Sequence, residues 1–226
     1  MSIAEKLTTI AENVPKVFQA GYDKGKSESG GSGENPLEYA TSLYSAYRAV
    51  TFDDDDNELL LNVPNIGGLS DACYCTFMNA KGIKKITLKG NVNKNAFAYQ
   101  SFLQGSSVVE VDFTEYNMIP TTMISFCNGA KQLVSLNGIF DMSQCTNANG
   151  FFPDSQALRE VRFKENTIGV NLSAAWVPNL SAESVQSIID GLATVETAKT
   201  LTFNSKIALT DTQKNTISSK GWTLVQ

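Results

Sequence analysis

The chain of 226 residues contains no histidine. Histidine is the side chain whose charge changes nearest to neutral pH, and it is the commonest general base and metal ligand. The sequence also shows no recognisable nucleophile motif, and no glycine-rich loop leads from a strand into a helix, as phosphate binding requires. From these absences we expect a protein that is not an enzyme and that holds no cofactor.

Basic residues and cysteines are few, and long apolar runs are missing. The 18 lysines and arginines stand against 23 aspartates and glutamates, and the net charge of −5 disfavours nucleic acid or an anionic membrane as a partner. No stretch approaches the roughly 18 apolar residues of a membrane span. The four cysteines lack metal-ligand spacing, so we expect reduced, buried thiols. They are Cys73, Cys75, Cys127 and Cys145.

The chain does contain a repeat with a spacing of 25 residues. Four sets of positions recur in step, and every member is apolar except Gly138. A period of about 20–29 residues with an L-x-x-L-x-L pattern is typical of leucine-rich repeats, in which each repeat adds a short parallel strand. We therefore expect an α/β leucine-rich repeat solenoid with regular repeats over residues 71–166. The four sets are Phe77, Phe102, Cys127 and Phe152; Ile83, Val108, Leu133 and Leu158; Ile86, Val111, Leu136 and Val161; and Leu88, Phe113, Gly138 and Phe163.

Residues 1–26 are expected to form a helical association segment. Ser2 and Glu5 match a capping box, and the apolar residues that follow have the heptad spacing of a coiled coil. This helix could pack on its own domain. Because residues 27–36 form a Gly/Ser-rich flexible linker, it could instead bury its apolar face on another copy or another protein. The proposed oligomerisation residues are Ile3, Leu7, Ile10, Val14 and Val17.

Residues 37–70 are expected to hold a helix that begins at Pro36 and then an N-terminal capping strand. Projecting the repeat backwards aligns Phe52, Leu61 and Val63 with Phe77, Ile86 and Leu88. The acidic run Asp53–Asp56 lies between the helix and the strand. Its order does not fit the calcium loop of an EF-hand, so we expect a solvated turn and no metal site.

Residues 167–226 are expected to form a last repeat and a helical C-terminal cap. After Phe163 the next match lies 40 residues on, at Leu192, Ala198, Leu201 and Phe203, so 15 residues are inserted. The insert contains a helix pattern that Ser181 can cap. Two further features are typical of a closing unit: a capping box at Thr210 and Gln213, and a final strand from Trp222.

The side chains that alternate with the buried strand positions form a polar face of mixed charge. It contains no aromatic residue, although protein-binding hot spots are enriched in tyrosine, tryptophan and arginine. A solvated face and an interaction surface are both compatible with this pattern, and loops or the N-terminal helix could bind a partner instead. The face consists of Lys85, Thr87, Lys89, Glu110, Asp112, Asn137, Glu160, Arg162 and Lys164.

Three turns resemble BspA-like leucine-rich repeats of gut bacteria and their phages: F-M-N-A-K-G-I-K-K-I-T-L, F-C-N-G-A-K-Q-L-V-S-L and F-F-P-D-S-Q-A-L-R-E-V-R-F. The endings S-A-E-S-V-Q-S-I-I-D-G-L-A and K-G-W-T-L-V are similar to the C-terminal part of such proteins. The start M-S-I-A-E-K-L-T-T-I-A-E-N-V-P-K-V-F-Q-A-G resembles the N-terminus of phage tail, fibre and baseplate proteins.

This resemblance implies a non-enzymatic structural or adhesion protein of a virion. It would associate with itself, as a trimer rather than a dimer, or with other particle proteins, and it could engage a cell-surface receptor. The first residues lack the apolar stretch of a secretion signal, so we expect synthesis in the host cytoplasm. The alternative is a bacterial surface-type repeat protein for adhesion or protein binding, located in the cytoplasm or exported by a non-classical route.

Overall fold

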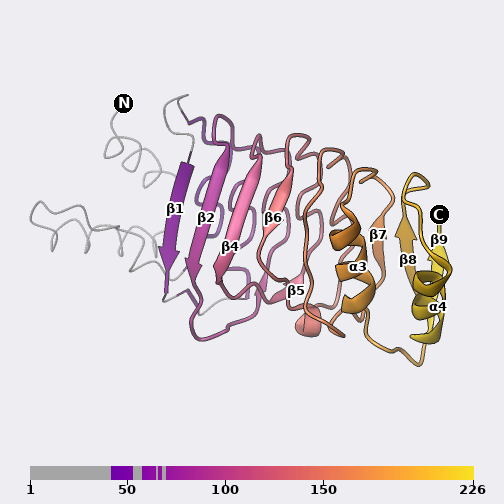
Figure 1. Ribbon diagram of the computed structural model, residues 1–226. Helices are drawn as coiled ribbons and strands as arrows, with labels where there is room; N and C mark the ends of the chain where they lie inside the picture. Colours follow the sequence, from indigo (N-terminus) through magenta and orange to yellow (C-terminus); the bar gives the residue numbers. More distant parts are fainter. Residues whose placement is uncertain (1–41, 53–57, 65, 68–69) are drawn as a thin grey trace, which may run out of the picture.

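The computed structural model describes residues 42–52, 58–64, 66–67 and 70–226. Four parallel strands lie side by side in the order β1-β2-β4-β6: β1 (Glu58–Val63), β2 (Lys85–Gly90), β4 (Glu110–Tyr116) and β6 (Ser135–Asn137). A pair, β3 (Phe97–Ala98) and β5 (Pro120–Thr122), precedes the 3-10 turn η2 (Met142–Gln144). The C-terminal part holds β7 (Leu172–Ala174), α3 (Ala182–Gly191), β8 (Lys199–Phe203), α4 (Asp211–Ser219) and β9 (Trp222–Val225). The expected mixed α/β fold with parallel strands is therefore confirmed (Figure 1).

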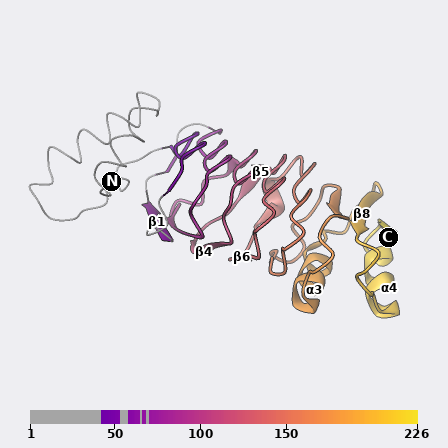
Figure 2. The same ribbon diagram turned by 90° about the horizontal axis from the view of Figure 1, so that it is seen from above.

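The strands β2, β4 and β6 pair in the register that the 25-residue spacing predicts, up to a bulge after Thr87. Lys85 lies opposite Glu110, and Glu110 lies opposite Ser135, which in turn bridges Glu160. The alternate residues Ile86, Val111 and Leu136 point inward and are buried. Figure 2 shows β1, β4 and β6 along one long side of the molecule and β5 along the other, with α3 and α4 on the side of β1, β4 and β6.

The turn segments opposite the main sheet follow a backbone pattern that the spacing did not predict. Every second N–H donates to a carbonyl of the next turn, as in Cys75 to Gln100 at 2.9 Å and Phe77 to Phe102 at 2.8 Å. Each of these turns also contains two residues with positive φ, four positions apart, which makes the chain wind tightly without a helix. These pairs are Ser45 and Ala49, Cys75 and Asn79, Ser101 and Gly105, Ser125 and Gly129, and Gly150 and Asp154.

A column of aromatic rings runs through the core behind these turns. Tyr47 stacks on Phe77 at 5.1 Å, and Phe102 stacks on Phe126 at 5.4 Å, while Phe126 meets Phe151 edge to face at 5.2 Å. Cys127 and Phe152, like Phe77, lie midway between the two positive-φ residues of their turns, as the 25-residue spacing predicts, whereas Phe102 lies one residue before that position. All four side chains are fully buried.

The helix expected from Pro36 is wrong over the part of it that the structure describes. Residues 42–50 form hydrogen-bonded turns, because Ser45 and Ala49 have positive φ, and N–H groups such as that of Tyr47 donate to the next turn. The capping strand is present as β1, but Leu61 lies opposite Leu88 rather than Ile86. The linker 27–36, the Asp53–Asp56 run and the whole segment 1–26 lie outside the described residues.

The capped helices and most buried positions of the C-terminal part agree with the sequence, but the strand β7, which pairs with β8, was not predicted. Ser181 caps α3, Thr210 and Gln213 form a capping box on α4, and Gly221 ends α4 with a φ of 85°. In the last repeat, Leu192, Leu201 and Phe203 are buried as predicted. Ala198 is exposed instead, since it lies in the loop before β8.

Candidate functional site

In the N-terminal half of the polar face, the charged side chains form ion pairs and hydrogen bonds with other side chains of the same chain. Lys85 and Glu110 form an ion pair of 3.3 Å, and the hydrogen bond from Lys85 to Glu110 raises the pKa of the lysine. The amide of Asn137 donates to Glu110 at 3.1 Å. A bulge follows Thr87, so Lys89 lies opposite Glu115 and pairs with it at 2.7 Å, an interaction that even spacing could not reveal. This half of the face therefore has the contacts of a solvated surface.

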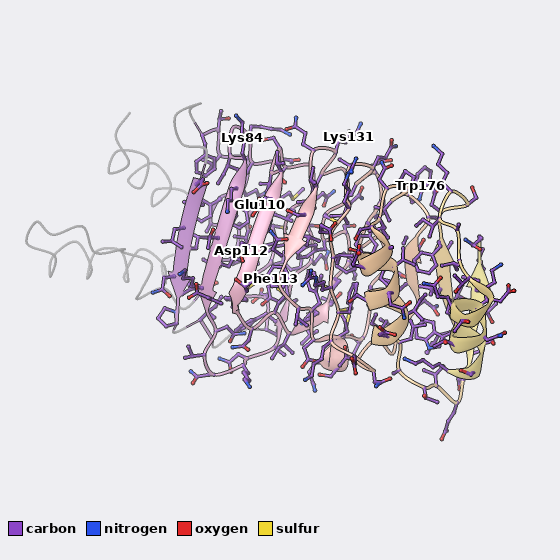
Figure 3. All side chains as sticks on the ribbon, in the orientation of Figure 1. Lys84, Glu110, Asp112, Phe113, Lys131 and Trp176 are labelled. Atoms are coloured by element: carbon purple, nitrogen blue, oxygen red, sulfur yellow. The ribbon has the colours of Figure 1, made fainter. Side chains whose placement is uncertain are left out.

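At the carboxyl ends of its strands, the main sheet splits between β4 and the segment that follows β6. Asp112 pairs with Asn137, and the next bridge joins Met118 to Phe140. Between these two pairings, the segment that follows Asp112 contains residues 113–117, whereas the segment that follows Asn137 contains only residues 138–139. The two chain segments therefore diverge and rejoin. In Figure 3, Glu110, Asp112 and Phe113 follow one another along β4 toward the edge where this split opens.

Two local features build the split. The carboxylate of Asp112 accepts hydrogen bonds from the N–H of Thr114 at 3.0 Å and from its hydroxyl at 2.8 Å, and these fold the bulge. Partial burial alone would raise the pKa of Asp112, but the bonds from Thr114 outweigh it and lower the pKa. Opposite the bulge, Gly138 has a φ of 138° and leaves the space that the ring of Phe113 fills.

A groove of about 710 Å³ opens at this split. The side chains of Asn117, Asn137 and the 59% exposed Ile139 line it. Of the predicted face residues, the structure brings Asn137, Glu160, Arg162 and Lys164 to this groove, and Lys94 and Asp141 join them. The remaining predicted residues, on β2 and the first half of β4, lie outside it: Lys85, Thr87, Lys89, Glu110 and Asp112.

The charged groups of the groove differ in whether they are already paired. Lys164 and Asp141 form an ion pair of 2.6 Å. Burial would raise the pKa of Asp141, but hydrogen bonds from Lys164 and Ser143 lower it. Arg162 and Lys94 are exposed, and their side chains make no ion pair or hydrogen bond with any residue in the described ranges. The groove therefore carries available positive charge in a chain of net charge −5.

The cysteines of the described residues are buried thiols. The four cysteines are free and buried, as expected, and burial raises the pKa of Cys73 and of Cys127 to about 12, so these remain thiols. Within the described ranges, no group of acidic or cysteine side chains is placed to hold a metal ion. No helix in this part of the chain is long and apolar enough to cross a membrane.

Comparison of the chain with protein-family models, with curated proteins and with solved structures found no match. The groove must therefore be interpreted from its own residues. Two features of the sequence indicate the split that opens this groove. Gly138 is the one position where the apolar repeat fails, and Asp112-x-Thr114 is the pattern of an Asx turn.

Proposed function

We propose that this chain is a non-enzymatic leucine-rich repeat solenoid of the BspA-like type that serves as a structural and adhesion component of a phage tail, fibre or baseplate. In this proposal residues 1–26 associate the chain with further copies, as a trimer, or with other particle proteins. The repeats then project a binding face toward a partner or a cell-surface receptor.

One observation carries this proposal. Strands that lie 25 residues apart in the sequence pair in parallel and in register, through Lys85, Glu110 and Ser135. Such stacking gives an extended, rigid face, which is the way repeat proteins present binding surfaces. The other support is the resemblance of the first residues to phage tail proteins, together with their heptad spacing.

The association is tested by the mass of the full chain in solution, measured by light scattering. We expect a homo-oligomer, and we expect the double variant Leu7→Glu, Ile10→Glu to be a monomer, since charges on the heptad seam cannot be buried. The matched control is Thr8→Glu, Thr9→Glu, which adds the same charges on the outer side of the heptad pattern and should keep the wild-type mass. A monomeric wild-type chain would count against association through this segment.

A further inference from the structure

We propose that the groove between β4 and residues 137–141 binds an extended acidic peptide segment of a partner protein. The peptide main chain would pair with the N–H and C=O of Gly138, and a peptide carboxylate would lie on Arg162. This inference rests on the part of the proposed function in which the repeats engage a partner. It does not depend on association through residues 1–26, so either proposal can fail while the other stands.

The first argument is the state of the backbone in the split. On either side of Gly138 and Ile139 the chain is paired: Leu136 N–H donates to the carbonyl of Glu160 at 2.9 Å, and Phe140 N–H donates to that of Arg162 at 3.0 Å. The N–H and C=O of Gly138 and the N–H of Ile139 make no hydrogen bond to any other described residue, whereas the parallel bridge between Met118 and Phe140 engages the C=O of Ile139. Unpaired main-chain groups in a groove beside a strand are the groups that an added extended peptide uses.

The second argument is the charge at the end of the groove. Lys164 is held by Asp141, and Glu160 accepts hydrogen bonds from the hydroxyls of Ser181 at 3.1 Å and Ser184 at 3.4 Å. The serine hydroxyls orient the Glu160 carboxylate but do not cancel its charge, so the groove lining holds three cationic side chains against two carboxylates, and Arg162 is its exposed guanidinium. A guanidinium can bind a carboxylate through two parallel hydrogen bonds, so it favours an acidic ligand over a neutral one.

The third argument separates a peptide from a sugar chain. Ile139 is exposed beside the unpaired backbone and offers an apolar contact to one side chain of an extended peptide, whose side chains alternate in direction. The aromatic rings that line the groove, Phe113 and Tyr116, are only 1% and 4% exposed. No ring face in the groove is therefore open for stacking against a sugar, and the peptide is the better fit.

The test measures the binding of fluorescein-labelled Thr-Glu-Val-Glu-Thr, blocked at both ends, to the full chain by fluorescence anisotropy at low salt. Three further ligands are compared: the peptide with Gln in place of both Glu, the peptide with an N-methylated central valine, and an oligogalacturonate. We expect the acidic peptide to bind about tenfold more tightly than the Gln peptide, since a charged bidentate pair contributes about that factor. N-methylation should abolish binding.

The protein variants are Arg162→Gln and its control Arg159→Gln, an exposed arginine of the same turn that does not line the groove. Arg162→Gln should lower the affinity about tenfold, and Arg159→Gln should leave it unchanged. Ile139→Ser, which removes the apolar contact and leaves the charge of the groove unchanged, should weaken binding as well. Equal binding by both arginine variants, binding of the oligogalacturonate in place of the peptide, or no peptide binding up to about 5 mM would each overturn the proposal.

Discussion

Gly138 shows how a single residue shapes the groove. Its equivalents in the neighbouring turns are Leu88, Phe113 and Phe163, whose side chains fill the core. At Gly138 the ring of Phe113 occupies the place of the missing side chain, and the φ of 138° is one that residues with a Cβ rarely adopt. The glycine therefore permits both the packing of Phe113 and the path of the chain around the split.

We predict that Gly138→Ala destabilises the protein by about 1–3 kcal/mol, because the new Cβ would overlap the Phe113 ring and strain the backbone. The matched control is Gly169→Ala, where φ is not positive and no atom lies within 4 Å of the added Cβ. It should be neutral or stabilising by up to about 1 kcal/mol. Urea unfolding of both variants measures the difference, and equal stabilities would refute this account of Gly138.

A second residue-level feature is a buried hydrogen-bonded chain between neighbouring turns. The hydroxyls of Tyr99 and Tyr116 are 3.0 Å apart, and the Cys73 thiol lies 3.7 Å from that of Tyr116. Burial raises the pKa of all three groups, so they stay neutral. A buried polar network of this kind is stable only when its members meet, and it therefore helps to fix how these turns are aligned.

At the scale of elements, α3 takes the place of a further strand at the edge of the main sheet. The N–H of Val161 donates to the hydroxyl of Ser184 at 3.0 Å, and the N–H of Phe163 donates to that of Ser187 at 2.9 Å. Lys220, at the end of α4, donates to three carbonyls of the last turn of α3. The sheet edge and the helix terminus are thus both satisfied by side chains.

We predict that the double variant Ser184→Ala, Ser187→Ala costs about 2–4 kcal/mol, since two largely buried N–H groups lose their acceptors. Amide hydrogen exchange at Val161 and Phe163 should accelerate beyond the change in global stability. The control Ser218→Ala removes a serine of α4 whose hydroxyl bonds only within its own helix, to Asn215 at 3.0 Å, and should change stability little. Unchanged exchange at the two amides would contradict this role of α3.

The sequence period predicted the elements that depend on local, regular patterns. The period predicted β2, β4 and β6 and their register as far as the bulge after Thr87, while capping residues and helical apolar spacing predicted α3 and α4. The helix expected before Phe52 failed because apolar spacing does not distinguish a helix from a tight turn with the same buried residues. The later turns carry a distinguishing signal, the recurrence of Asn79, Gly105, Gly129 and Asp154, which are residue types that tolerate positive φ, but the equivalent residue in the failed segment is Ala49.

The groove could be predicted only in part. Alternation placed Asn137, Arg162 and Lys164 on the correct face, because that face is set by the period of a strand. The split itself depends on unequal numbers of residues between two bridges, as between Asp112 and Met118 against Asn137 and Phe140. A fixed spacing assumes turns of equal length, so it could not predict the split. It also could not predict that Arg162 is unpaired among the described residues, because that depends on which neighbouring side chains pair with one another.

At the scale of the whole molecule, the elements form a row in which each sheet strand packs on its neighbours (Figure 1). β1 contacts β2, β2 contacts β4, and β8 lies between β7 and β9. The buried residues nevertheless form one continuous core from Leu43 to Trp222. Stability in such an arrangement is carried by contacts between adjacent turns, as in proteins built from stacked repeats.

The proposed solenoid therefore predicts that the effect of a core substitution depends on its position along the row. Ile217→Ala, in a fully buried position of α4, should cost about 2–4 kcal/mol locally. It should speed amide exchange in α4, β8 and β9 while β1 and β2 keep their protection, because only neighbouring turns are coupled.

Phe126→Leu, at the centre of the aromatic column, should instead lower protection in the turns on both sides. Exchange followed by mass spectrometry measures both patterns. A uniform loss of protection from β1 to β9 in Ile217→Ala would show a single cooperative unit instead.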